Sequence, residues 1–359
     1  MAKYVWYSNG TDVTGKELAR QLGATGSKTK PANLRAGDIV LCWGAKTDEA
    51  VRLAAGIFVL NHPDKIRINR DKMAALRVLH GVRELTPTIA AFLPANEIIA
   101  AIDRGRMTLP VVGRKSHHQG GKGFWLCVTK SQVTKAAEAG ADYFQKYIDI
   151  KDEYRLHIFR GEMIHAVKKV ENPSNDAWVS QRKDVLKEMA GERQLNEETM
   201  DFILNKLVKE YTLPDYVIRS NKRGWKFSTA NNPPAALRTA AISALGALGL
   251  DFGAVDCAID IGNHPYLIEV NSGPGLQGVA LERYVASIRS WATEMERPAP
   301  APRRAVREEA VPAPARARRS AVGAAEADVS DDDAVALLRV AESDEDRRNV
   351  LRLLRRQRG

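Results

Sequence analysis

The stretch that decides the fold is Gly253–Gly275, with the sequence GAVDCAIDIGNHPYLIEVNSGPG. Two apolar runs flank Gly262-Asn263, a dipeptide suited to a tight hairpin turn. Counting back from that turn places Asp256 directly opposite Glu269 on the neighbouring strand. Directly opposed Cβ atoms lie about 4.5–5.5 Å apart, and like charges at this spacing destabilise a sheet. A pair of acids in this position therefore suggests a function that outweighs its cost.

A divalent metal ion would explain the pair. Asn271 follows Glu269 by two residues and so projects from the same face of its strand. Two carboxylates and an amide oxygen, without a compensating base near them, predict a site for a hard cation such as Mg²⁺. The alternative is a pair of solvent-facing acids on an edge hairpin. The apolar LIEVN context of Glu269 favours the metal site, and the Ser-Gly-Pro-Gly turn after it would bring backbone close to a ligand.

A second hairpin is predicted in Glu153–Val170, EYRLHIFRGEMIHAVKKV, with Arg160-Gly161 as its turn. The same counting pairs Glu153 with Lys168, and it places Arg155 and His157 on the face of Glu153. Taken alone, the pair is best interpreted as a cross-strand salt bridge. In a nucleotide cleft, however, the acid would accept ribose hydroxyls and the lysine would meet phosphate.

A glycine-rich loop lies between two predicted strands in Leu109–Cys127, LPVVGRKSHHQGGKGFWLC. Glycines allow backbone N–H groups to approach phosphate oxygens, and Arg114, Lys115 and Lys122 add positive charge. The loop is not a Walker A motif, because Gly-Lys-Ser/Thr is absent and no helix is predicted after it. His117 and His118 suggest metal ligands, but adjacent histidines on such a loop are more often exposed to solvent.

The bulk properties predict a cytoplasmic protein of more than one domain. The chain has 359 residues, and its N-terminus, MAKYVWYSNG, lacks the apolar run of a signal peptide. No stretch approaches the roughly 18 uncharged apolar residues of a membrane span. Cys42, Cys127 and Cys257 lie far apart in apolar runs, as buried thiols in a reducing compartment do. The net charge of +10 raises the question of nucleic acid, but nucleotide phosphates also attract basic clefts, so nucleic acid is only a secondary expectation.

The chain divides into five predicted segments. An N-terminal α/β domain of parallel type spans 1–68, with strands at YVWY, DIVLCW and Gly56–Leu60, a helix at Gly15–Leu22, and a further helix following at Asn69–His80. A central subdomain spans 69–142, with a helix near Ser131–Ala139, and a third subdomain spans 143–295 with a polar helical insertion at 173–211. The Pro/Ala/Arg-rich stretch 296–330 predicts a disordered linker, and 331–359 predicts short helices that dock on the core or on a second subunit.

These three motifs, in this order and spacing, resemble the ATP-grasp superfamily over roughly residues 39–291. Within it the chain is similar to D-alanine–D-alanine ligases and ribosomal-protein glutamate ligases, and most similar to ATP-grasp proteins of tailed phages. The resemblance implies an α+β fold, with a small N-terminal parallel α/β domain and two antiparallel-sheet subdomains that clasp ATP. It also implies a cytoplasmic, ADP-forming carbon–nitrogen ligase that phosphorylates a carboxylate to an acyl phosphate and joins it to an amine. Small-molecule or peptide carboxylates and amines would be its partners.

The resemblance also implies roles for individual residues. ATP and two Mg²⁺ ions are the implied cofactors, with Asp256, Glu269 and Asn271 as metal ligands. Lys72, in NRDKMAAL, matches a lysine that reaches the α-phosphate, and IRSNKRGW gives Arg219 and Asn221 catalytic roles at the transferring phosphate. Arg114 replaces a lysine, and Lys146 holds a hinge position that is often acidic. The implied ATP-binding residues are Lys72, Arg114, Gly120, Gly121, Gly123, Gln145, Lys146, Tyr147, Ile148, Glu153 and Lys168.

Three other functions fit parts of the pattern. A nucleotide-binding protein without ligase turnover would share the hinge and the glycine-rich loop. An ATP-grasp ligase that adds an amino acid to a modified nucleic-acid base would suit the basic charge. A dinucleotide oxidoreductase is disfavoured, because no G-x-G-x-x-G follows the first strand. The sequence does not indicate which carboxylate and amine are joined.

Overall fold

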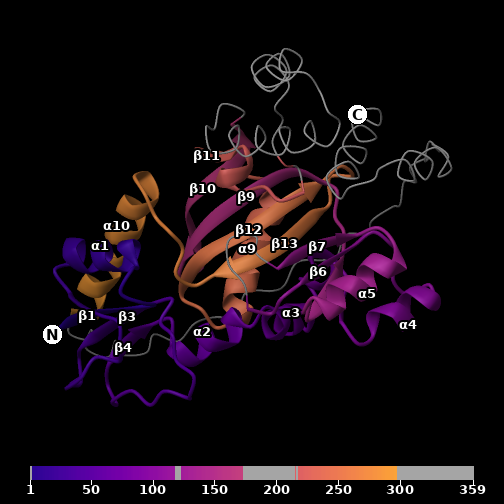
Figure 1. The fold of residues 1–359 in the computed structure, drawn as a ribbon. Coiled ribbons are helices and arrows are strands. Elements are labelled where there is room, and N and C mark those ends of the chain that lie inside the picture. The colour runs from indigo at the N-terminus through magenta and orange to yellow at the C-terminus, as the bar shows by residue number, and fades with distance from the viewer. Residues whose placement is uncertain (1, 118–122, 173–214, 216, 297–359) are drawn as a thin grey trace, which may run out of the picture. The chain divides into compact units, whose positions relative to one another are not determined.

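Three β-sheets carry the fold, and each corresponds to one block of the sequence (Figure 1). The computed structural model describes residues 2–117, 123–172, 215 and 217–296. Residues 215 and 217–219 belong to one structural unit, and all other described residues belong to another. The predicted insertion at 173–211 and the predicted linker and helices beyond Glu296 lie outside the described residues. No helix in the part of the chain that is described has both the length and the apolar character needed to cross a membrane.

Sheet A is the predicted parallel sheet at the N-terminus. Its strand order is β2-β1-β3-β4, and all of its pairings are parallel. Helix α1 begins at an N-cap, Asp12, whose carboxylate accepts a hydrogen bond from the backbone N–H of Gly15 at 2.8 Å. The elements are β1 (Lys3–Tyr7), α1 (Val13–Leu22), β2 (Thr25–Ser27), β3 (Ile39–Trp43) and β4 (Phe58–Leu60).

Two helices follow sheet A where the sequence predicts one over Asn69–His80. They are α2 (Pro63–Arg70) and α3 (Lys72–His80). The predicted start was wrong because Asp71 adopts an extended conformation and caps α3, accepting hydrogen bonds from the N–H groups of Met73 and Ala74 at 3.0 and 3.1 Å. Lys72 is therefore the first residue of a helix.

Sheet B is antiparallel, with the order β5-β8-β6-β7. Helices α4 and α5 share an apolar core with it, built around residues such as Val111, Val133 and Phe144. The predicted helix near Ser131–Ala139 is confirmed as α5, which starts at a Thr129–Gln132 capping box. The elements are η1 (Thr86–Thr88), β5 (Phe92–Pro94), α4 (Ile98–Asp103), β6 (Val111–Arg114), β7 (Phe124–Cys127), α5 (Lys130–Glu138) and β8 (Tyr143–Lys146).

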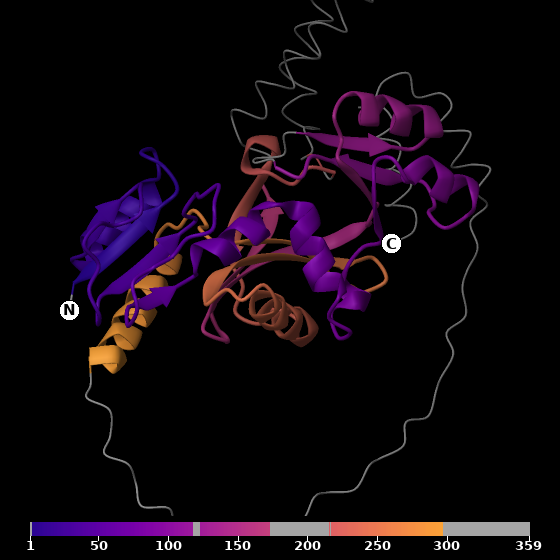
Figure 2. The same ribbon diagram turned by 90° about the horizontal axis from the view of Figure 1, so that it is seen from below.

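Sheet C is antiparallel, with the order β11-β10-β9-β12-β13. Helix α9 packs on one face, here called the back face, where Leu156, Val255 and Val270 join its apolar side (Figure 2). The opposite, front face carries the predicted acids. The elements are β9 (Ile150–Phe159), β10 (Glu162–Glu171), η3 (Asn221–Arg223), β11 (Trp225–Thr229), α9 (Ala235–Ala247), β12 (Phe252–Asp260) and β13 (Pro265–Asn271).

Helix α10 (Val279–Glu296) ties sheet C to sheet A. Its residue Tyr284 is fully buried against Trp43 of β3 and Phe252 of β12, with Trp43 stacked on Phe252 at 5.1 Å between ring centroids. Asn61, also fully buried, donates to the carbonyl of Phe252 at 2.9 Å and accepts from the N–H of Asp251 at 2.7 Å. These contacts fix the edge of sheet A against the start of β12.

Candidate active site

The front face of sheet C presents Asp256, Glu269 and Asn271 together, as the sequence predicts. Asp256 is the direct cross-strand partner of Glu269. Asn271 pairs with Ala254, which is the next pair on the same face of the sheet. The turn, however, has one residue more than the predicted two, because the backbone N–H of Asp260 donates to the carbonyl of His264. A bulge at Ile268 restores the predicted register, since Asp256 pairs with Glu269 while Cys257 pairs with Leu267.

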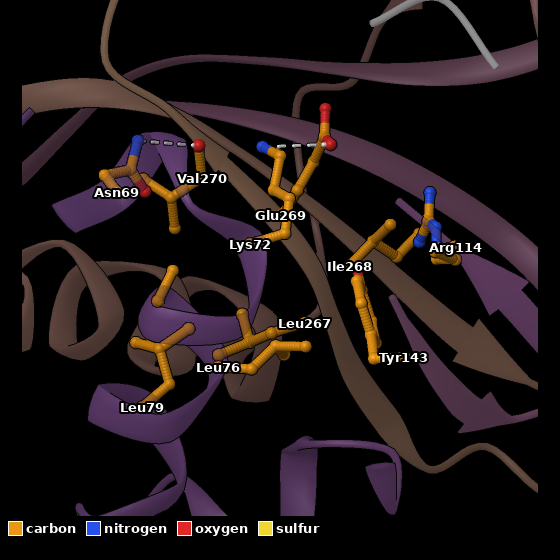
Figure 3. Close-up of a pocket in the computed structure, with 11 residues that line it drawn as sticks. Asn69, Lys72, Leu76, Leu79, Arg114, Tyr143, Leu267, Ile268, Glu269 and Val270 are labelled. Atoms are coloured by element: carbon orange, nitrogen blue, oxygen red, sulfur yellow. Dashed lines mark hydrogen bonds and ion pairs between the residues drawn. The ribbon is translucent and has the colours of Figure 1, made fainter. Parts of the chain in front are cut away.

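Cations already neutralise both acids, which corrects the expectation of an uncompensated pair. Arg155 donates from Nε and Nη2 to the two Asp256 oxygens at 2.6 and 2.8 Å. Lys72 Nζ lies 3.3 Å from Glu269 Oε2 (Figure 3). Asn271 donates its amide N–H to Glu269 at 3.1 Å. The sequence did not indicate that Arg155 is the partner of Asp256. The two residues are far apart in the sequence and meet only because β9 pairs with β12 in the sheet.

The cations around Glu269 keep it ionised. Burial opposes its charge, but the charges of Lys72, Arg114 and Arg155 and the hydrogen bond from Asn271 outweigh burial. Together they hold the pKa of Glu269 well below its usual range. The acid is therefore a permanent carboxylate at neutral pH.

The three ligand candidates suit a hard divalent cation chemically. Carboxylate and amide oxygens are the donors that Mg²⁺ takes from proteins, usually one or two carboxylates completed by water and substrate phosphates. Among the described residues no group of three or more His, Cys, Asp or Glu side chains could hold a metal ion. A metal here would therefore rely on Asn271 or on non-protein ligands for its third contact.

A pocket beside Glu269 brings together basic residues from separate elements. Lys72 starts α3, Arg114 ends β6, and both line the pocket with Glu269 and Tyr143 above an apolar floor (Figure 3). The backbone N–H of Lys72 donates to the carbonyl of Ser116 at 3.0 Å, which ties α3 to the start of the glycine-rich loop. Burial raises the pKa of Tyr143 to about 12, so its hydroxyl stays protonated. The remaining lining residues are Asn69, Ala75, Leu76, Leu79, Leu267, Ile268 and Val270.

The predicted pairing of Glu153 with Lys168 is wrong. Glu153 instead forms an ion pair with Lys169, and Lys168 pairs with Asp152 at 2.8 Å. The turn at Arg160-Gly161 is where the sequence places it, but a bulge at Ile164 shifts every later pairing of β10 by one residue. Lys168 consequently leaves the front face, and Lys169 takes the place expected for it.

The predicted hinge joins sheets B and C. Gln145 and Lys146 close β8, and Tyr147 and Ile148 lie in the short connection to β9. The N–H of Lys146 donates to Ala91 and that of Tyr147 to Pro110, at 2.8 and 3.1 Å. Ile148 makes no hydrogen bond with any described residue, so its N–H is available to a ligand. This arrangement suits the edge of a nucleobase.

The other predicted residues are described only in part. Gly123 ends the glycine-rich loop at a φ of +65°, where a side chain would be strained, whereas Gly120 and Gly121 lie outside the described residues, as does His118. Arg219 is buried and belongs to the second structural unit, so its role stays a prediction. Asn221 is exposed at the start of η3, before β11.

Two front-face residues were not expected from the sequence. Phe227 of β11 is 44% exposed, and its ring lies under the guanidinium of Arg155 at 4.8 Å and near the ammonium of Lys169 at 5.7 Å. The bulged Ile268 lines the pocket beside Glu269. One aromatic in a short strand and one apolar residue before an acid are weak signals, so pattern alone could not have identified them.

Comparison with solved structures identifies the architecture. D-alanine–D-alanine ligase from Bacillus anthracis matches with a TM-score of 0.51 at 15% identity, over 82% of this chain and 95% of that chain. The ATP-grasp ligase PsnB complexed with minimal precursor matches with a TM-score of 0.52 at 11% identity, over 82% and 99%. This chain has the ATP-grasp fold.

Other comparisons add limited detail. The D-cycloserine synthetase DcsG matches the fold with a TM-score of 0.50 at 14% identity, over 82% of this chain and all of that chain. Structures with this fold have been solved with ATP, for the Bacillus anthracis ligase, and with Mg and ADP, for PsnB. No protein-family model matches the sequence, and no curated protein sequence matches it. The resemblance inferred from the motifs is thus confirmed at the level of the fold.

Proposed function

We propose that this protein is an ATP- and Mg²⁺-dependent ligase that joins a carboxylate to an amine and releases ADP and phosphate. The observation that carries the proposal is the direct pairing of Asp256 with Glu269 beside Asn271, on an antiparallel sheet of an ATP-grasp fold. The cationic pocket of Lys72 and Arg114 next to Glu269 supplies the charge that a polyphosphate needs. The N–H of Ile148 and the carboxylate of Glu153 provide polar groups for a base and a ribose.

The chemistry follows from charge. A metal held by these residues would supply positive charge that neutralises the phosphate oxygens during phosphoryl transfer. Lys72 and Arg114 would hold the phosphates electrostatically, with Asp256, Glu269 and Asn271 as the metal's protein ligands. The carboxylate oxygen would attack the γ-phosphorus as the bond to the ADP oxygen breaks, which gives the acyl phosphate and ADP. The amine would then attack the acyl carbon, so that the C–N bond forms, the C–O bond to phosphate breaks and the nitrogen loses a proton to solvent. By resemblance, Arg219 and Asn221 would act at the transferring phosphate.

The substrate class is bounded only by relatives of the fold. The similar solved structures are a D-alanine–D-alanine ligase, a D-cycloserine synthetase and an ATP-grasp ligase complexed with minimal precursor. Amino acids and peptides are accordingly the first carboxylates and amines to test. ADP release would be measured against panels of both, with mass spectrometry of the products.

Asp256→Asn tests the assignment directly. It keeps the shape of the side chain but removes its charge, and we expect ADP release to fall at least ~100-fold, the scale of losing one key electrostatic contact. Glu17→Gln, at a partly exposed position on α1, serves as the control for expression and folding. Unchanged nucleotide turnover in Asp256→Asn would show that the metal assignment is wrong.

A further inference from the structure

Both oxygens of Asp256 are engaged by a cation in this structure. Arg155 occupies both oxygens in a bidentate pair at 2.6 and 2.8 Å, and the Asp256 side chain is only 7% exposed. Bidentate guanidinium–carboxylate pairs are among the strongest hydrogen-bonded contacts in proteins.

The guanidinium is fixed from its other side by an aromatic ring. Phe227, on β11, lies with its ring centroid 4.8 Å from it, and the negative face of such a ring attracts a cation. β11 is two strands away from β9 in the sheet order, with β10 between them. Arg155 thus lies between a carboxylate on β12 and a ring on β11. No short stretch of the sequence predicts this arrangement.

The two ion pairs already have no net charge without a metal. Asp256 and Glu269 contribute two negative charges, and Arg155 and Lys72 contribute two positive ones. Asn271 turns the N–H end of its amide toward both acids, at 3.4 and 3.1 Å, which is the end that cannot bind a cation. A divalent ion that entered alone would leave two uncompensated positive charges in a partly buried site, and a polyphosphate would cancel them.

We propose that Arg155 occupies the place of the metal in the nucleotide-free site and so restricts divalent cations to entry together with a polyphosphate. This inference rests on the metal site of the proposed function and adds a regulation to it. Arg155 must yield at least one Asp256 oxygen before a metal can bind there. Binding of metal and of nucleotide are then coupled, and by linkage each tightens the other by the same factor.

Binding of Mn²⁺ to the full-length protein, followed by the loss of the free-ion EPR signal, tests this without turnover. For the wild type we expect weak Mn²⁺ binding alone and binding at least ~10-fold tighter with a non-hydrolysable ATP analogue, within the usual range of such couplings. Arg155→Met keeps an unbranched aliphatic side chain but removes the guanidinium charge. It should bind Mn²⁺ alone at least ~10-fold more tightly than the wild type, because Asp256, which faces Glu269, then lacks its cation.

Two further variants keep the test decisive. Lys168→Met removes a cation from β10 on the opposite face, where it pairs with Asp152, and should leave Mn²⁺ binding unchanged. Phe227→Ala removes the ring beside the guanidinium without adding a buried charge and should tighten Mn²⁺ binding several-fold even if Arg155→Met fails to fold. If neither Arg155→Met nor Phe227→Ala binds Mn²⁺ more tightly than the wild type, the proposal is overturned. If instead the analogue binds to no variant, the proposed function fails, while the Mn²⁺-only comparison still decides the role of Arg155.

Discussion

Lys169 on β10 is the ion-pair partner of Glu153 on β9, and both side chains are at least 85% buried on the front face of sheet C. The neighbouring Lys168 lies on the back face, close to the ring of Tyr154. Two adjacent lysines of one strand therefore have separate surroundings. One faces the proposed nucleotide site and the other faces the side of α9.

This difference predicts unequal effects of the same substitution. Lys169→Met should weaken ATP binding about 10-fold or more. It should also remove the buried ion pair with Glu153, a loss typically worth several kcal/mol of stability. Lys168→Met should change ATP affinity little, because its ion pair with Asp152 is about one third exposed. Titration calorimetry with a non-hydrolysable ATP analogue would measure both. Equal losses in the two variants would contradict the observed register.

The sequence predicts strands and turns here better than it predicts register. The turn at Arg160-Gly161 was correct because both residues take positive φ, of +47° and +82°, as a two-residue hairpin requires. The error arose from Ile164, which lies on the same face as His165 and so breaks the alternation. A bulge adds one residue at small cost, and what selects it is packing of Ile164 near Phe159 and α10, a helix that is distant in sequence.

The pairing of Asp256 with Glu269 was predicted correctly, but the prediction assumed a regular hairpin with a two-residue turn. The loop after β12 is one residue longer than expected, and the bulge at Ile268 compensates, so that Asp256 still meets Glu269. Local pattern therefore predicted that the two acids meet, since acids inside apolar strands are unusual. It could not identify Arg155 as the partner of Asp256, because that contact depends on β9 lying beside β12 in the sheet. Long-range strand order is not encoded in any short stretch.

Gly273 lies where the turn after Asn271 meets the end of β3. A Cβ added there would lie 2.8 Å from the Cα and N atoms of Gly44, which are backbone and cannot rotate away. Gly273→Ala should therefore displace this turn and with it Asn271, lowering ADP release and the melting temperature together. Gly275→Ala is the matched control, since nothing lies within 4 Å of its added Cβ. If the two variants behave alike, the close approach of the two loops is not important.

Asn61 should be a large contributor to stability. Its side chain makes hydrogen bonds to the backbone at Asp251 and Phe252, and its φ is +57°. Asn61→Ala removes these bonds, leaves buried polar groups unsatisfied and adds backbone strain, at a cost of about 3–5 kcal/mol. Asn61→Gly loses the same bonds without the strain and should be about 1 kcal/mol less destabilised. Urea unfolding would measure the difference, and a more stable Ala variant would contradict this account of the position.

His157 predicts how stability depends on pH. It lies on the front face two residues beyond Arg155, is 3% exposed, and its Nδ1 makes no hydrogen bond within the described residues. Burial, with smaller effects of Arg155 and His165, lowers its pKa to about 3 from an ordinary value of 6.5. The unfolded chain then binds a proton that the folded chain rejects. The stability due to the neutral ring is fully present above pH 6.5 and is lost progressively as the pH falls from 6.5 toward 3.

Replacing this imidazole should flatten that dependence. Between pH 6.5 and 4.5, above the ordinary range of carboxyl groups, His157→Gln should reduce the slope of unfolding free energy against pH by up to about 1.4 kcal/mol per pH unit. His264→Gln is the control, because the His264 side chain is 70% exposed at the hairpin loop. Urea unfolding at several pH values would measure both slopes. An unchanged slope in His157→Gln, with the wild-type slope intact in His264→Gln, would mean that His157 accepts a proton in the folded protein as readily as in the unfolded chain.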